Sequence, residues 1–228
     1  MRESLALAYL LARLSDTVAD GAKTTAEEEL IARRAEIEKC LAASPDRRDI
    51  EAVWTTIREG QRFDQQRFSR SGTSPLNDQE LDRYAYLVAG CVGEFWTELC
   101  AKKMPGFCRL STAEMKRLGV RFGKGLQLVN ILRDREADSS KGRTYVPTER
   151  FNAVLTEARA HLQAARRYVD ALRNYRLRVA CLLPLYLAEE TLDLLEQNTS
   201  APRAKVSRRR VWTLFLRALC LGKADFAL

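Results

Sequence analysis

Apolar residues recur every three or four positions along nearly the whole chain, the spacing that places them on one face of a helix. Runs in which β-branched residues alternate with polar ones are absent, so the pattern gives no sign of strands. The chain is therefore predicted to be all-α. The periodicity and its breaks predict helices over about 3–20, 25–43, 47–68, 77–103, 111–138, 148–173, 177–197 and 207–221.

Capping residues and loop formers mark several ends of these predicted helices. Thr25–Glu28 and Ser111–Glu114 both have the spacing of a capping box. Asn77 is a favoured N-cap residue for the fourth helix. The segment 69–76, which contains a glycine and a proline, is the clearest loop in the chain.

Composition narrows the class of protein. A chain of 228 residues with 46% hydrophobic residues, 11 Gly and 6 Pro indicates a globular protein with a substantial core. The formal charge of +8 is concentrated at one end, because residues 201–228 contribute +6 of it. Basic residues gathered there, without aromatic residues interleaved along a groove, do not favour nucleic-acid binding. No nucleic-acid partner is expected.

The spacing of the cysteines and the apolar N-terminal segment indicate the cellular compartment of the protein. The six cysteines include no C-x-x-C pair, and the single histidine, His161, has no neighbours at zinc-ligand spacing. We interpret the cysteines as reduced thiols of a cytoplasmic protein. Arg13 and Asp16 interrupt the first apolar stretch before it reaches the length of a membrane span, so no targeting segment is predicted.

One chemical pattern occurs twice: a pair of aspartates four residues apart. Asp16 and Asp20 end the first predicted helix, and Asp134 and Asp138 end the fifth. Residues at this spacing differ by about 40° around a helix, so both carboxylates of a pair leave the same side. In a cleft of effective dielectric ~20, two such charges about 6 Å apart cost about 3 kcal/mol, and a buried pair therefore needs a cation. Hard oxygen ligands suit Mg²⁺, which completes its shell with water and substrate phosphate oxygens.

Polar neighbours extend both aspartate pairs into stripes. Tyr9 and Arg13 share the side of the first helix that carries its aspartates, and Gln127 and Asn130 share that side of the fifth. The first helix is apolar nearly all round, so its stripe is predicted to face an internal cavity. One pair alone would more simply be a solvated helix end. Two pairs, each with an amide or guanidinium group one turn away, favour a buried polar site.

Four strings, LLARLSDTVAD, YAYLVAGCVGEF, GKGLQLVNILRDREAD and GRTYVP, closely resemble in order and spacing the squalene/phytoene synthase family of head-to-head prenyltransferases. The resemblance runs from about Leu5 to Leu195. Its most specific part is the Q-x-x-N-x-x-R-D-x-x-x-D string that ends at Asp138. The phrase IREGQRFDQQRF looks closer to squalene-type than to phytoene-type members.

This resemblance implies a single-domain, all-α isoprenoid-synthase bundle around a central cavity that holds two prenyl diphosphates. It implies that Mg²⁺ bridges four catalytic carboxylates to the diphosphates: Asp16, Asp20, Asp134 and Asp138. Tyr84 matches the tyrosine that family mechanisms assign to the carbocation steps or to proton removal. The residues implied to bind the diphosphates are Arg13, Gln127, Asn130, Arg133, Arg143 and Tyr145.

The implied chemistry needs a polar mouth and an apolar interior. Ionising an allylic diphosphate requires metal and cationic stabilisation of the departing group. The carbocation must then be shielded from water, where aromatic faces can stabilise it. Ala89, Gly90 and Gly93 either allow tight helix packing or leave room for a prenyl chain.

The resemblance to squalene-type members implies condensation of two farnesyl diphosphates via presqualene diphosphate towards squalene or a related C30 isoprenoid. NADPH would be a further cofactor where squalene is the product. A phytoene-type condensation of two geranylgeranyl diphosphates is the alternative within the family. The non-enzyme alternative is a degenerate helical interaction protein that retains these residues for structural reasons.

The two ends of the chain carry separate expectations. Family members usually have a further helix before the first acidic motif, and this sequence starts fifteen residues before Asp16, so we expect residues 1–200 to form the catalytic domain without that helix. Residues 201–228 are expected to pack on the same domain as a basic amphipathic helix. Its charge run and the apolar string WTLFLRALCL are compatible with a solvated surface and with peripheral contact on an anionic membrane.

Overall fold

A computed structural model describes residues 1–20, 24–69, 74–197 and 205–223, and side chains throughout these ranges except at 19–20 and 221–223. These residues are almost entirely helical and form no strand, which confirms the all-α prediction. The elements are α1 (Arg2–Asp20), α2 (Thr25–Ala32), α3 (Arg34–Ala43), α4 (Arg47–Phe68), α5 (Asp78–Ala85), the π-helical turn η1 (Tyr86–Gly90), α6 (Cys91–Lys103), α7 (Thr112–Ser139), the 3-10 turn η2 (Thr148–Arg150), α8 (Phe151–Ala171), α9 (Tyr175–Gln197) and α10 (Arg208–Lys223).

Side-chain caps fix two of the predicted helix starts. The side chain of Asn77 accepts from the backbone N–H of Glu80, and the Glu80 carboxylate accepts from the N–H of Asn77, which forms a complete capping box. Ser111 caps α7 in the same way by accepting from the N–H of Glu114. Both positions agree with the prediction.

The predicted helix over 25–43 is wrong in two respects. Thr24, not Thr25, is the N-cap, and its hydroxyl accepts from the N–H of Glu27. The helix also breaks at Arg33, whose backbone angles are φ −87° and ψ 7°. Because α2 buries no residue whereas α3 buries Ile37 and Leu41, the break lets α3 follow the core independently of α2.

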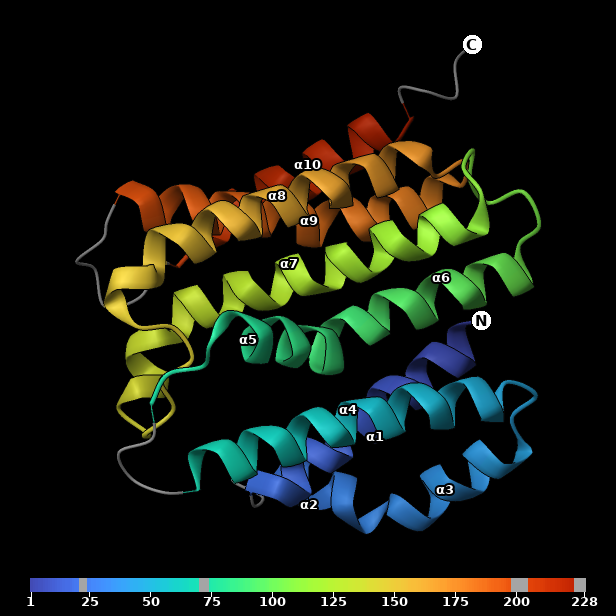
Figure 1. Ribbon diagram of the computed structural model, residues 1–228. Coiled ribbons are helices and arrows are strands. Elements are labelled where there is room, and N and C mark those ends of the chain that lie inside the picture. The colour runs from blue at the N-terminus through green and yellow to red at the C-terminus, as the bar shows by residue number, and fades with distance from the viewer. Residues whose placement is uncertain (21–23, 70–73, 198–204, 224–228) are drawn as a thin grey trace.

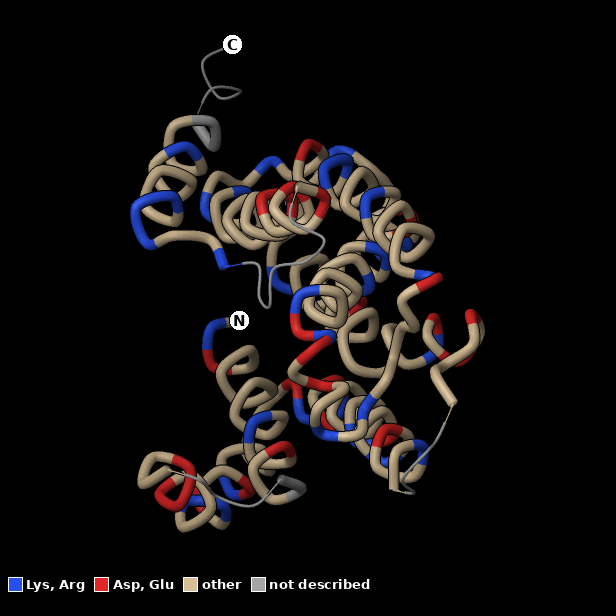
Figure 2. The backbone as a smooth tube through the Cα atoms, turned by 90° about the vertical axis from the view of Figure 1, so that its left-hand side faces the viewer, with Lys and Arg blue, Asp and Glu red and all other residues tan. Residues whose placement is uncertain are grey.

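The helices pack around two hydrophobic cores that meet at α6. Figure 1 shows α6 lying between the N-terminal helices and the remaining bundle. The larger core is built by α5 to α10, and Leu214 and Ala218 of α10 belong to it. The smaller core joins α1, α3 and α4 to one face of α6, and its buried members are Leu11, Ile37, Leu41, Ile50, Val53, Cys91, Phe95 and Leu99. Figure 2, turned by 90°, again shows the N-terminal helices below the others.

Glycines bring α6 and α7 into backbone contact. A Cβ atom added to Gly93 would lie 1.9 Å from the carbonyl oxygen of Gly119, and one added to Gly123 would lie 2.1 Å from the carbonyl oxygen of Ala89. Neither position has room for a larger residue. The small residues therefore serve helix packing, and Ala89 and Gly93 also line a cavity described below.

Helix α4 connects the N-terminal helices to the rest of the described chain. One side of α4 packs on α1, and the other packs on η1 and α6. A Cβ atom at Gly60 would lie 2.7 Å from a side-chain carbon of Val88, so α4 and η1 approach closely at that point. The π-helical turn begins two residues after Tyr84, and such turns occur frequently at functional sites.

Candidate active site

A cavity of about 530 Å³ lies between α1, α4, α6 and α7 and is lined by four of the predicted site residues. They are Asp16 from α1, Tyr84 from α5, Gln127 from α7 and Arg143 from the segment after α7. The structure thus brings together residues that are 127 positions apart at most in the sequence.

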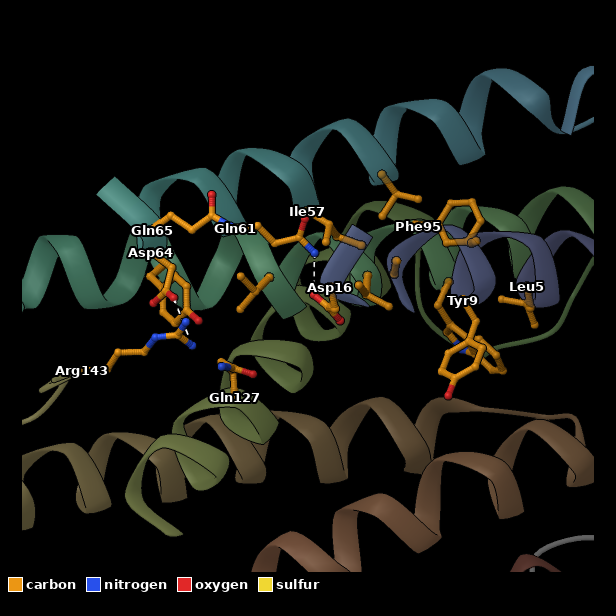
Figure 3. Close-up of a pocket in the computed structure, with 17 residues that line it drawn as sticks. Leu5, Tyr9, Asp16, Ile57, Gln61, Asp64, Gln65, Phe95, Gln127 and Arg143 are labelled. Carbon is orange, nitrogen blue, oxygen red and sulfur yellow. Dashed lines mark hydrogen bonds and ion pairs between the residues drawn. The ribbon is translucent and has the colours of Figure 1, made fainter. Parts of the chain in front are cut away.

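The cavity has a polar end and an apolar end (Figure 3). Asp64, Gln61, Gln65, Gln127 and Arg143 gather at one end, and Asp16 lies between them and the other. At the opposite end lie Leu5, Tyr9 and Phe95. Carboxylate, guanidinium and amide groups can bind a charged head group and its counter-ions, while the apolar wall can hold a hydrocarbon chain.

Asp16 is held at the cavity wall by contacts between α1 and α4. Its Oδ1 atom accepts a hydrogen bond of 2.5 Å from Nε2 of Gln61. One residue before it, the hydroxyl of Ser15 accepts from the indole N–H of Trp54 at 2.7 Å. These two bonds fix the turn of α1 that carries Asp16.

Asp134 and Asp138 lie on consecutive turns of α7. The guanidinium group of Arg133 pairs with the carboxylate of Asp134, at 2.5 Å between Nη2 and Oδ2. Asp138 is half-buried, and burial together with the negative charge of Asp134 raises the pKa of its carboxyl group, although Lys141 and Arg143 act against this. The two carboxylates therefore repel each other as the spacing predicted.

Asp134, Asp138 and Arg133 are not among the residues that line the cavity. Three further predicted residues have other surroundings. The side chain of Asp20 falls outside the described residues, although its backbone ends α1. Arg13 is exposed and forms an ion pair of 3.7 Å with Glu27 of α2. Asn130 is also exposed, and it lines a second cavity rather than the first.

A glycine turn at the end of α7 places Arg143. The N–H of Arg143 donates to the carbonyl of Asp138, and the N–H of Gly142 donates to the carbonyl of Ser139. With Gly142 at φ +78°, these bonds form a Schellman motif. The turn reverses the chain directly after the second aspartate pair, so the Arg143 side chain returns to the cavity that Tyr84 lines.

Behind Tyr84, Tyr145 joins a buried polar group whose carboxylate, Asp64, the sequence analysis did not identify. The hydroxyl of Tyr145 donates to Oδ1 of Asp64 at 2.5 Å and lies 3.4 Å from the hydroxyl of Tyr84. The rings of the two tyrosines stack with centroids 5.2 Å apart. Arg143 places Nη1 3.6 Å from Oδ2 of Asp64. Tyr145 is itself buried behind Tyr84, while Asp64 lines the cavity.

A second cavity of about 420 Å³ adjoins the first between α6, α7 and α9. The two share part of their wall, formed by Val88, Val92, Trp96 and Gln127. The second cavity is otherwise lined mainly by apolar residues of α6 and α7 and by Tyr168, Cys181 and Pro184. Gln127 therefore contributes to both spaces.

Mg²⁺ is the ion that the resemblance implies, and the donors present fit it. Asp16, Asp134 and Asp138 offer the oxygen ligands that Mg²⁺ prefers. The raised pKa of Asp138 beside Asp134 identifies a carboxylate pair that a cation would relieve of repulsion. Water and phosphate oxygens would complete the shell of such an ion.

Within the described ranges, the only three-ligand group compact enough to hold a metal by itself is Asp82, Glu157 and His161, away from the central cavity. Asp82 there already pairs with the ammonium group of Lys124, and His161 accepts at Nδ1 from the guanidinium of Arg121. These partners account for the group without an ion. In the part of the chain that is described, no helix has the length and apolar character needed to cross a membrane.

The structure is thus an all-α bundle whose cavity has acidic, cationic and amide groups at one end and apolar walls at the other. The sequence profile described as "Squalene/phytoene synthase" matches residues 1–154 and 149–213. The chain therefore belongs to the squalene/phytoene synthase family, which confirms the resemblance seen in its motifs. This is a family of prenyltransferase-type enzymes that bind prenyl diphosphates and generally use a divalent metal to do so.

Relatives of both types match the chain. The 15-cis-phytoene synthase of Synechococcus elongatus is 28% identical over 264 aligned positions, which cover 96% of this chain and 82% of the relative. The squalene synthase of Eremothecium gossypii is 28% identical over 177 positions, covering 66% of this chain. The chain spans only 39% of that squalene synthase and 12% of the bifunctional lycopene cyclase/phytoene synthase of Neurospora crassa.

Solved structures share the fold at low identity. The complex of TcSQS with the ligand BPH1237 superposes with a TM-score of 0.78 at 18% identity and covers 95% of this chain and 78% of that one. A dehydrosqualene synthase in complex with a ligand gives a TM-score of 0.68 at 19% identity, covering 97% of this chain and 87% of that one. The isoprenoid-synthase architecture expected from the motifs is thereby confirmed.

Proposed function

We propose that this chain is a Mg²⁺-dependent prenyltransferase that joins two farnesyl diphosphates head to head, via presqualene diphosphate, towards squalene or a related C30 isoprenoid. The observation that carries the proposal is the composition of the central cavity. Asp16, Gln127 and Arg143 share one cavity with Tyr84 and with an apolar wall that includes Phe95 and Trp96. A diphosphate and its prenyl chain need these two environments side by side.

The polar end would bind and orient the diphosphates. Asp16, Asp20, Asp134 and Asp138 would hold Mg²⁺, which when bound supplies positive charge to the departing pyrophosphate. Arg143 would add a guanidinium group at the same end, and Gln127 would position an oxygen from the opposite wall. Arg13, Asn130 and Arg133 are proposed to assist diphosphate binding on the strength of the family motif. The motif implies the same role for Tyr145, but Tyr145 is buried and does not line the cavity, so we assign it no direct contact with the diphosphate.

The apolar end would exclude water from the cation that forms. Phe95, Trp96 and Tyr9 offer aromatic faces to the cavity, and such faces attract a positive charge by about 0.5–2 kcal/mol each. Tyr84 also lines the cavity, and its hydroxyl lies near the polar end, 3.4 Å from the Tyr145 hydroxyl that donates to Asp64. The second cavity gives room beside the first for a second prenyl chain.

Phytoene-type condensation of two geranylgeranyl diphosphates is the second candidate, and one observation favours it. The cyanobacterial phytoene synthase aligns over 82% of its own length, whereas the squalene synthase aligns over 39%. The two functions differ in chain length and in the final step, which is a reduction by NADPH for squalene and loss of a proton for phytoene.

Product analysis tests the proposal. The purified chain is incubated with Mg²⁺ and with farnesyl or geranylgeranyl diphosphate, each with and without NADPH, and the lipid is identified by mass spectrometry. A C30 product from farnesyl diphosphate supports the first candidate, and a C40 product supports the second. Absence of pyrophosphate release from both substrates would leave the helical interaction protein as the better interpretation.

We also propose that α10 rests on an anionic membrane surface, where a lipid product would leave. Trp212 and Leu216 of α10 are 66% and 57% exposed, and the exposed Arg209 lies one turn before Trp212 on the same side of the helix. The guanidinium of Arg217 lies over the ring of Tyr186 in α9. Apolar and basic side chains on one face suit a charged lipid surface. The chain should float with vesicles containing phosphatidylglycerol and not with pure phosphatidylcholine, and Trp212→Ser with Leu216→Ser should abolish flotation. Unchanged flotation of the double variant would contradict the proposal.

A further inference from the structure

Tyr84, Tyr145 and Asp64 form a chain of hydrogen-bonding groups that leads away from the central cavity. Each of the three is at most 8% exposed. Tyr84 lines the cavity, its hydroxyl lies 3.4 Å from that of Tyr145, and Tyr145 reaches Asp64 at 2.5 Å. The two tyrosine rings stack, and the Phe68 ring packs at a steep angle against Tyr145 with 5.1 Å between the ring centroids, which restricts the geometry.

The chemistry of these groups sets the direction of the chain. A carboxylate has no hydrogen to donate, so Tyr145 must spend its single hydroxyl hydrogen on Asp64. Tyr145 can then only accept from Tyr84, whose own hydrogen points away from the cavity. The guanidinium of Arg143 supplies the opposite charge that a buried carboxylate needs. Burial raises the pKa of both tyrosines, so each keeps its proton.

We infer that Asp64 and Tyr145 are positioning residues that turn the lone pairs of the Tyr84 oxygen towards the reacting cation. The inference rests on the proposed function, because it assigns a task to Tyr84 within that reaction. A hydroxyl that presented its hydrogen to the cavity would repel a developing positive charge. One that presents its oxygen attracts the charge, at no cost of reorientation during the step.

Neither residue needs to touch the substrate for this effect. Tyr145 lies behind Tyr84, and its hydroxyl acts on the cavity only through the Tyr84 hydroxyl. Asp64 lines the cavity, but its Oδ1 atom is occupied by Tyr145. Removing the Tyr145 hydroxyl would leave Tyr84 without its acceptor and free its hydrogen to turn into the cavity.

Binding of a stable cation analogue tests this without requiring turnover. The probe is farnesyldimethylamine, protonated at neutral pH, titrated by calorimetry in the presence of Mg²⁺ and inorganic pyrophosphate; farnesol is the neutral control ligand. Tyr145→Phe keeps the charge of Asp64 and breaks only the chain. It should weaken binding of the amine by about tenfold and leave farnesol binding unchanged. Equal affinity of wild type and Tyr145→Phe for the amine would overturn the inference.

A second variant guards against misfolding of the first. Asp64→Asn can donate an amide hydrogen to Tyr145 and so reverse the chain, and it should also weaken amine binding. In a Tyr84→Phe background, Asp64→Asn can affect amine binding only through the loss of the carboxylate charge. If Asp64→Asn weakens amine binding equally with and without the Tyr84 hydroxyl, the positioning role is refuted. Asp193→Asn, at an exposed carboxylate that pairs with Arg159 and does not line either cavity, is the folding control.

Activity then separates this inference from the proposed function. If wild type forms a head-to-head product, Tyr145→Phe should lower kcat with little change in KM and release more prenyl alcohol per pyrophosphate. If wild type forms no such product, the proposed function fails. The amine titration still decides which way the Tyr84 hydroxyl points.

Discussion

Gln61 donates a hydrogen bond through Nε2 to Oδ1 of Asp16 over 2.5 Å and thereby joins α4 to α1 at the cavity wall. The amide helps to hold the carboxylate in one orientation at the wall of the cavity. Groups in this position orient the ligands of a metal rather than binding the metal themselves. Gln61 lies on the polar side of the cavity, close to the residues proposed to bind diphosphate (Figure 3).

Replacing Gln61 by leucine should raise the Mg²⁺ concentration needed for half-maximal activity by about 10–100-fold, because Asp16 loses the partner that orients it. Saturating Mg²⁺ should restore most of kcat. Gln66→Leu, at an exposed position on the same helix, is the matched control and should leave the Mg²⁺ dependence unchanged. An unaltered Mg²⁺ titration of Gln61→Leu would contradict this role.

Asp46 anchors the start of α1 and should control acid stability. Burial alone would raise the pKa of Asp46, but hydrogen bonds from Ser4, Lys103 and Lys102 outweigh it and lower the pKa from 3.8 to about 2. The stabilisation is therefore complete above about pH 4 and is lost as the pH falls towards 2. Asp46→Asn should lower the free energy of unfolding by about 1–3 kcal/mol at pH 7.

Urea denaturation of wild type and Asp46→Asn between pH 7 and pH 2 measures this contribution. The difference in unfolding free energy should shrink as the pH falls through this range. Asp49→Asn is the control, because Asp49 pairs with the same Lys102 at the surface, where an ion pair contributes at most about 1 kcal/mol. A difference that stays constant down to pH 2 would show that the carboxylate charge is not responsible.

Two glycines with positive φ make it possible to distinguish the effect of backbone strain on stability from an effect on catalysis. Gly142 has φ +78° and places Arg143, whereas Gly106 has φ +73° in the connection between α6 and α7. An added Cβ atom meets no neighbour at either site. Alanine at each position should therefore lower stability by a similar amount, about 1 kcal/mol, through backbone strain.

Only Gly142→Ala should also lower kcat/KM, by several-fold, because it disturbs the turn that returns Arg143 to the cavity. Thermal unfolding and steady-state kinetics on the two variants make the comparison. Equal kinetic losses in both variants, or none in either, would show that this turn does not position the site.

Local signals in the sequence were sufficient for most helix boundaries. Asn77 and Ser111 carry their own hydrogen-bonding partners three residues on, so their caps form from local chemistry. The break at Arg33 and the π-helical turn after Tyr84 have no such local signal. At Arg33 the break separates α2, which buries no residue, from α3, which buries Ile37 and Leu41.

The sequence predicted only part of the candidate site, because some of its contacts have no local signal in the sequence. The four-residue spacing of the aspartate pairs identified Asp16, Asp134 and Asp138 as candidates. The strings that resemble the family identified Tyr84 and Arg143. Asp64 stands in the polar string QRFDQQRF of α4, where a lone aspartate is typical of a solvated surface. Its burial depends on Tyr145, 81 residues later, and no local pattern indicates that contact.

Binding of inorganic pyrophosphate, followed by calorimetry with and without Mg²⁺, tests most directly whether carboxylates from α1 and α7 act together on one diphosphate. Wild type should bind pyrophosphate only when Mg²⁺ is present. Asp16→Asn and Asp134→Asn should each weaken that binding by at least about tenfold, or 1.4 kcal/mol, with unchanged circular dichroism. Asp193→Asn should behave as wild type. Mg²⁺-independent binding, or wild-type affinity in either of the first two variants, would contradict the account.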